Sequence, residues 1–169
     1  MKITIIVLII LLIISYLFIN FKTDNKDIKD NNINTKTNIN MEKIIKIDTL
    51  KKDTFKYFQL TVTAGNGIKA EVSLNDQILA NIDNESKQII SNEANQIIKN
   101  GDNNINVKIN GVTENVDNAI FSDVPLDIIV YAMNTQDFPT ENDELIHIKI
   151  DSNTLKNNSI LGYTFNVSK

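Results

Sequence analysis

The sequence predicts an all-β domain, a two-sheet antiparallel β-sandwich of seven to nine strands, behind an N-terminal transmembrane helix. Three features predict this architecture: an uncharged apolar run at the start, a polar segment without periodicity after it, and an alternation of apolar and polar residues from about Ile44 onward. Alternation with a period of two places one face against a core and the other toward water, which is typical of half-buried antiparallel strands.

The apolar run covers residues 3–21 and contains no charged side chain. As a helix it would extend about 28 Å, close to the thickness of a bilayer's hydrocarbon core. The residues that leave it, Leu17 to Lys22, contain no small-residue cleavage site, and the chain has no cysteine to carry a lipid. We therefore expect an uncleaved signal-anchor at residues 1–21. A cleaved signal peptide is the alternative, because the run is short for a membrane span.

Residues 22–43 are rich in Asn, Thr and charge, and they predict a disordered polar tether. The lysines that follow the apolar run outnumber the single Lys2 before it, which favours a cytoplasmic domain by the positive-inside rule. The very short leading segment instead resembles a signal-anchor that exports the chain on its C-terminal side. We expect the exported arrangement, periplasmic or extracellular.

Residues 44–169 have the length of one domain with one core. This part of the chain carries a net charge of −6, and the whole sequence has no arginine. Nucleic-acid binding is therefore not expected, because it depends on a positive surface that neutralises phosphates. The absence of cysteine excludes disulfides and zinc-thiolate sites.

Six sets of alternating apolar residues predict strands, and Asn- and Gly-rich turns separate them. A short helical segment is also expected, with Ser91 as its cap and Gly101 as a left-handed end. The strand sets are Phe58, Leu60 and Val62; Ile68, Ala70, Val72 and Leu74; Ile105, Val107 and Ile109; Val124, Leu126, Ile128 and Val130; Ile146, Ile148 and Ile150; Leu161, Tyr163, Phe165 and Val167. The turn signals are Ala64 to Gly67, Asn75-Asp76, Asp83 to Ser86, Asn110-Gly111 and Lys156 to Ser159.

The stretch from Ile68 to Ile109 resembles galactose-binding-like and related jelly-roll β-sandwich modules. In those modules a Gly-x-Asn turn after a short buried apolar pair leads into a core strand. Here Gly101-Asp102-Asn103 matches the turn, and Ile105 to Ile109 matches the strand. The resemblance implies a jelly-roll-like fold. It transfers no ligand-binding residue, because the loops that carry them in that family have no counterpart here.

No residue of the sequence is assigned to catalysis or to cofactor binding. His147 is the only histidine, and the strand pattern turns it away from the core between two isoleucines, which indicates a strand-surface residue. One histidine without cysteine cannot build an ordinary zinc or copper site. The nearest glycine-rich segment, Gly65-Asn66-Gly67, lacks the third glycine and the helix of a phosphate loop. No catalytic residue and no cofactor are therefore expected.

The loop from Met133 to Glu144 is the densest group of oxygen ligands in the chain. Its weak candidates for a metal site are the carboxylates Asp137, Glu141, Asp143 and Glu144, with amides from Asn134 and Asn142. The spacing does not match an EF-hand, and Pro139 fits a turn between two strands. We interpret the loop as an acidic, solvated connection.

The aromatic residues Phe55, Tyr57 and Phe58 open the first long strand, and at least one of them must lie outside the core of that sheet. Taken together, these features predict a membrane-tethered, non-catalytic interaction module that contacts another envelope protein or a surface polymer. The alternatives are a hydrolase that uses two carboxylates of the acidic loop, and a calcium-binding module of the adhesion type.

Overall fold

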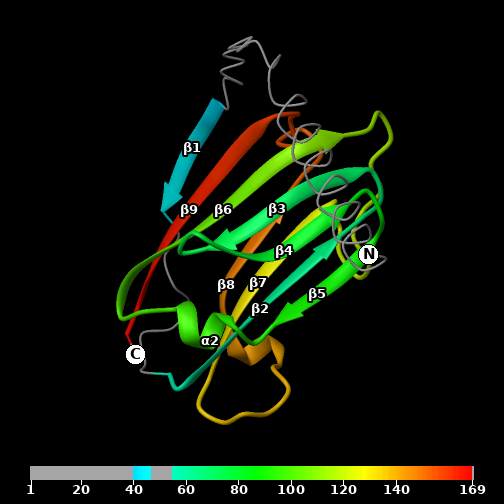
Figure 1. Ribbon diagram of the computed structural model, residues 1–169. Helices are drawn as coiled ribbons and strands as arrows, with labels where there is room; N and C mark the ends of the chain where they lie inside the picture. The colour runs from blue at the N-terminus through cyan, green and yellow to red at the C-terminus, as the bar shows by residue number, and fades with distance from the viewer. Residues whose placement is uncertain (1–39, 47–54, 169) are drawn as a thin grey trace, which may run out of the picture. The chain divides into compact units, whose positions relative to one another are not determined.

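The computed structural model describes the backbone at residues 40–46 and 55–168, and the side chains at residues 45, 46 and 55–168. These residues form nine strands in two sheets, one short helix, α2 (Ala94–Ile97), and one 3-10 turn, η1 (Glu141–Asp143) (Figure 1). The predicted all-β, two-sheet architecture is confirmed. The expected anchor at residues 1–21 lies outside the described residues, and none of the helices in the described part is long and apolar enough to span a bilayer.

Two sheets share the nine strands, and every strand pairing is antiparallel except that of β1 with β9. The five-stranded sheet has the order β1 (Asn40–Lys46), β9 (Ser159–Val167), β6 (Gly101–Val112), β3 (Ile68–Leu74) and β4 (Gln77–Asp83). The four-stranded sheet has the order β5 (Lys87–Ser91), β2 (Tyr57–Ala64), β7 (Leu126–Met133) and β8 (Glu144–Ile150). The chain passes repeatedly from one sheet to the other.

One hydrophobic core lies between the sheets, and residues of both contribute to it. The predicted inward positions of β2, β3, β6, β8 and β9 are all buried, as are the β7 positions Leu126, Ile128 and Val130. The predicted alternation is confirmed at these positions, since a strand with one face on the core turns every second side chain inward. In β2 the alternate residues Thr61 and Thr63 are buried as well. Val124 is the exception, since β7 begins only at Leu126. The preceding Pro125 has no N–H to donate to a ladder.

The Asn75-Asp76 turn joins β3 and β4 in a two-residue hairpin, in which both residues have positive φ angles of 46° and 67°. Asn and Asp tolerate that region better than most residues, so the turn signal is confirmed. The alternation of apolar residues did not predict strands β4 and β5. Both lie at sheet edges, and their exposed isoleucines, Ile78 and Ile90, blur the alternation.

The predicted turn at Asn110-Gly111 is wrong, because β6 continues through this dipeptide to Val112. Ala70 pairs with Ile109 and Lys69 with Gly111, so Asn110 is the extra residue of a β-bulge. The Asn110 side chain donates a hydrogen bond to Glu71 across the strands (3.0 Å).

The predicted cap of the short helix is also wrong. Ser91 lies in β5 and pairs with Leu60, and α2 begins after Glu93 without a side-chain capping bond. Gly101 does adopt the expected left-handed conformation, with φ of 90°, but it starts β6 rather than ending the helix. A helix of one turn has little need of a cap, since its neighbours in the core hold it in place.

Strand β1 begins at Asn40, inside the segment that the sequence assigns to the tether, so the sheet starts before the expected domain boundary at Ile44. It joins the edge of β9 in parallel, with Asn40 opposite Ser159 and Lys46 opposite Thr164. A parallel edge strand needs no turn to connect it with its neighbour, and a sequence pattern alone does not reveal such a pairing.

The strand registers define two ends of the sandwich. The entry end holds Asn40, the start of β9, and the β2–β3, β6–β7 and β8–β9 connections. The opposite end, here called the α2 end, holds α2 and the β7–β8 connection at residues 134–143 (Figure 1). Strand β1 therefore begins at the end opposite α2.

Candidate functional site

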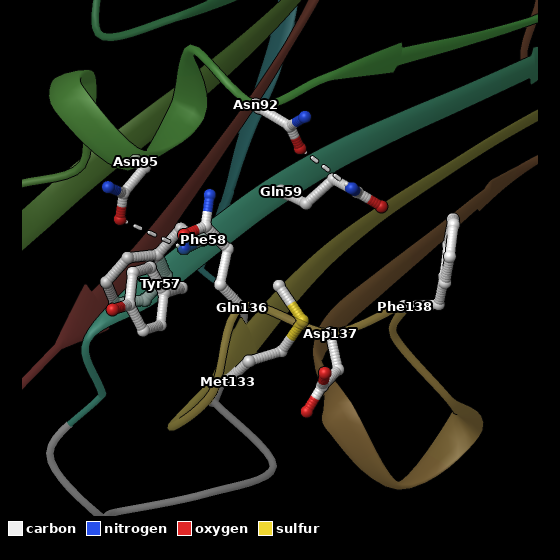
Figure 2. A pocket seen from close by; sticks show the side chains of 9 residues that line it. All are labelled: Tyr57, Phe58, Gln59, Asn92, Asn95, Met133, Gln136, Asp137 and Phe138. Atoms are coloured by element: carbon white, nitrogen blue, oxygen red, sulfur yellow. Dashed lines mark hydrogen bonds between the residues drawn. The ribbon is translucent and has the colours of Figure 1, made fainter.

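A pocket of about 350 Å³ opens at the α2 end, between the start of β2 and the β7–β8 connection. We call it the amide pocket, because four of its lining side chains are carboxamides. It is lined by Tyr57, Phe58, Gln59, Asn92, Asn95, Met133, Gln136, Asp137 and Phe138. Figure 2 shows Asn92 and Asn95 on one side and the residues of the β7–β8 connection on the other.

Two hydrogen bonds fix the side of the amide pocket next to α2. The Asn95 side-chain oxygen accepts the backbone N–H of Phe58 (3.2 Å), and the Gln59 side chain donates to the Asn92 side-chain oxygen (2.8 Å) (Figure 2). Both bonds link β2 to the segment that carries α2. This wall is therefore preorganised, whereas Gln136 and Phe138 on the other side are exposed.

The aromatic residues of β2 divide between the core and the pocket. Phe55 and Phe58 are buried and meet edge to face, with ring centroids 6.3 Å apart. Tyr57 is only half-buried and lines the amide pocket. The expectation that at least one of these aromatics lies outside the core is confirmed.

The four carboxylates of the acidic loop do not converge on one point. Asp137 is exposed at the amide pocket, and Glu141 is exposed on η1. Asp143 accepts hydrogen bonds from the backbone N–H and the hydroxyl of Thr140 (2.9 and 2.7 Å), which close the turn. Glu144 points to His147. Across the described ranges, no group of three or more His, Asp or Glu side chains is arranged to hold a metal ion.

A second polar group, the His147 cluster, consists of Ser122, Asp127, Glu144 and His147 on the outer side of β7 and β8. His147 Nε2 lies 2.7 Å from Asp127 Oδ1, and Nδ1 lies 3.3 Å from Glu144 Oε2. The Ser122 hydroxyl donates to the other oxygen of Asp127 (2.6 Å). His147 is half-buried on the face opposite the isoleucines, as predicted, but its two carboxylate partners were not foreseen.

The order of contacts in the His147 cluster is unsuited to serine-type catalysis. A nucleophilic serine needs the imidazole as its direct partner, with the carboxylate behind the imidazole. Here the carboxylate of Asp127 stands between Ser122 and His147. The arrangement instead connects the β6–β7 connection to β7 and β8, which is a structural role.

Two groups near the His147 cluster, Tyr131 and Lys149, have raised pKa values. Burial, followed by the negative charges of Glu144 and Asp127, raises the pKa of the Tyr131 phenol, so that it stays protonated. A hydrogen bond to Asp123 (2.6 Å) raises the pKa of Lys149, which stays charged. Both effects maintain the existing protonation states at neutral pH and create no acid–base group.

No family model, no curated protein and no solved structure matches this chain. Function is therefore inferred from the chain's own residues. Among the described residues, the amide pocket is the candidate ligand site, and the sequence analysis had singled out Tyr57, Phe58 and Asp137 of its lining.

Proposed function

We propose that this chain is a membrane-tethered, non-catalytic binding module of the cell envelope that holds an uncharged surface polymer in the amide pocket. The composition of the pocket carries the proposal. Carboxamides both donate and accept hydrogen bonds, as do hydroxyl groups and amides of a ligand. Aromatic rings at the rim, Tyr57 and Phe138, offer apolar faces to a ring or chain that lies between them.

Charge narrows the class of ligand. Asp137 is the only charged side chain among the described residues that line the pocket. An anionic polymer would bring negative charge to a site whose described lining residues include no cation to balance it, which is unfavourable. The pocket volume lies at the low end of the range for ligand sites, so it suits one or two units of a chain.

The membrane anchor at residues 1–21, the tether that follows it and the exported location belong to the same proposal. So does the finer description of the fold as jelly-roll-like and related to galactose-binding-like modules. That description is supported by the connections that cross between the two sheets. They run from β2 to β3, from β4 through β5 and β6 to β7, and from β8 to β9. The sequence of residues 3–21 supports the anchor.

The two alternatives have less support. A hydrolase would need two carboxylates of the acidic loop facing one cleft, and these side chains are directed to separate partners or to solvent. A calcium-binding module would need six to eight oxygen ligands around one point, and the same divergence opposes that geometry.

A binding experiment on the full chain in detergent tests the ligand. The probes are an immobilised neutral glucan and an anionic uronate polymer, and the variant is the double substitution Gln136→Ala with Phe138→Ala. Both side chains are exposed, so the variant is expected to fold. Phe121→Ala, an equally exposed phenylalanine at the entry end, is the matched control.

We expect the wild type to be retained on the neutral glucan. The double variant should lose at least about tenfold in affinity, which corresponds to about 1.4 kcal/mol of binding free energy, and the control should lose none. Retention on the uronate polymer alone, or equal binding by the double variant and the wild type, would refute the pocket assignment. The anchor is tested separately: the protein should resist extraction of membranes with alkaline carbonate.

A further inference from the structure

The turn Ala119–Ser122, in the β6–β7 connection, presents two apolar side chains to solvent. Phe121 is fully exposed (102%) and Ile120 is half exposed (50%). Phe121 also has a φ of 62°, in the left-handed region that turns normally give to Gly or Asn. A bulky apolar residue that is both strained and exposed destabilises the isolated domain, and such outliers cluster where a protein makes contacts.

Hydrogen bonds hold this apolar turn in a fixed shape. The N–H of Ser122 donates to the carbonyl of Ala119 (3.1 Å), and the N–H of Ala119 donates to the carbonyl of Val124 (2.9 Å). The Ser122 hydroxyl donates to Asp127 of the His147 cluster, and Ala119 itself is buried. Phe121 therefore projects from a turn that hydrogen bonds hold in place, as expected for a residue that makes a contact.

The apolar turn lies at the entry end of the sandwich. Residues 123–125 connect it to β7, whose first residue, Leu126, pairs with Ala64 and Ile150 at that end. Asn40, where the described chain begins, is at the same end, opposite Ser159. The first described residue, Asn40, therefore lies at the same end as the turn and at the end opposite the amide pocket.

We propose that the apolar turn docks on the surface of the bilayer, with Phe121 and Ile120 inserted among the lipid headgroups. This inference rests on the proposed anchor at residues 1–21. If the proposed tether at residues 22–39 is a flexible chain, its average end-to-end distance would be on the order of 20–25 Å, and the entry end would stay close to the membrane. At that range a weak apolar contact is intramolecular and gains from a high effective concentration.

The charges of the β6–β7 connection select the kind of lipid. Glu114, Asp117 and Asp123 belong to this connection, and an anionic surface would repel them. Lys149 is paired with Asp123, so its charge is already neutralised locally. The docked surface is therefore one of zwitterionic headgroups, and docking turns the amide pocket away from the membrane.

A tryptophan reporter tests the docking, because the chain contains no tryptophan. Phe121→Trp is made in the full chain and reconstituted in vesicles of phosphatidylcholine. Phe138→Trp, at the other end and equally exposed (96%), is the matched control. Ile120→Trp is a second reporter in the same turn, in case the first variant folds poorly. The emission of each full-chain variant is recorded in the vesicles, and quenching is measured with brominated phosphatidylcholine.

We expect a blue shift and strong quenching for Trp at 121 and at 120 in vesicles, and neither effect at 138. A protein that floats with the vesicles while the emission at 121 and 120 stays like that at 138 overturns the docking and leaves the anchor intact. A protein that does not float overturns both. A blue shift at 121 that depends on protein concentration and not on lipid identifies a second copy as the occupant and also overturns the docking.

Discussion

Replacing Gly65 by alanine should destabilise the domain strongly, because the added Cβ would overlap a neighbouring backbone segment. A Cβ at this position would lie 1.9 Å from the carbonyl oxygen of Asp117 and 2.9 Å from the carbonyl carbon of Asn118. Ordinary contacts begin near 3.4 Å, so the backbone of residues 117–118 would have to move by about 1.5 Å. The obstacle is backbone, which cannot rotate away as a side chain does.

Two hydrogen bonds tie the displaced segment to Asn66, the residue after Gly65. Asp117 donates its N–H to the carbonyl of Asn66 (3.2 Å), and its carboxylate accepts a hydrogen bond from the Asn66 side chain (2.8 Å). Overpacking costs about 1–3 kcal/mol, and each lost hydrogen bond costs about 1 kcal/mol. The free energy of unfolding should therefore fall by about 2–4 kcal/mol, and the melting temperature should fall by on the order of 10 °C.

Two other glycines serve as controls in the same melting assay, followed by circular dichroism on the full chain in detergent. Gly111→Ala places its Cβ 3.6 Å from the Lys69 Cβ, an ordinary contact, and should change stability by less than about 0.5 kcal/mol. Gly101→Ala meets no atom within 4 Å, but its φ of 90° should cost about 1–2 kcal/mol in strain. Equal melting of the Gly65 and Gly111 variants would refute the close approach.

Three further outcomes are expected. Val107→Asp buries an unpaired carboxylate between the sheets and should cost several kcal/mol, whereas Lys108→Gln on the outer face should be tolerated; urea titration separates them. Phe121→Asn relieves a left-handed phenylalanine and should raise stability by about 1 kcal/mol in the same titration. Hydrogen bonds from Asn110 and Lys108 lower the pKa of Glu71. The ionised Glu71 therefore adds to the free energy of unfolding at neutral pH, and this stabilisation disappears as the pH falls below 4.5. Thermal melts of wild type and Glu71→Gln should therefore differ at pH 7 and converge in acid.

The inward positions of the core strands were predictable because burial imposes a period of two that the sequence must obey. Two edge strands, β4 and β5, depart from that rule, since they expose Ile78 and Ile90 on the face that should be polar, whereas the edge strand β8 follows it. The predicted turn at Asn110-Gly111 was wrong for a different reason. Hairpin turns and β-bulges use the same residues, and the choice between them depends on the pairing partner, β3, which lies far away in the sequence.

The site residues were harder to predict. Asp127 did carry a local signal, as a single acid inside the apolar strand Leu126–Met133. Its partner His147 follows only from the register of β7 against β8, where Ile129 faces His147 and Asp127 faces Lys149. The amide pocket combines three segments of the chain. Asparagine is so common in this sequence that Asn92 and Asn95 do not stand out from it.

The position of β9 between β1 and β6 has a consequence for how the chain is made. The four-stranded sheet is complete once Ile150 has been synthesised, but the five-stranded sheet lacks an interior strand until residues 159–167 follow. Until then β1 has no partner, and one side of β6 remains an open edge, which is a template for pairing with other chains. Folding therefore finishes only after synthesis of the last strand, and a chain that ends before Ser159 should aggregate rather than fold.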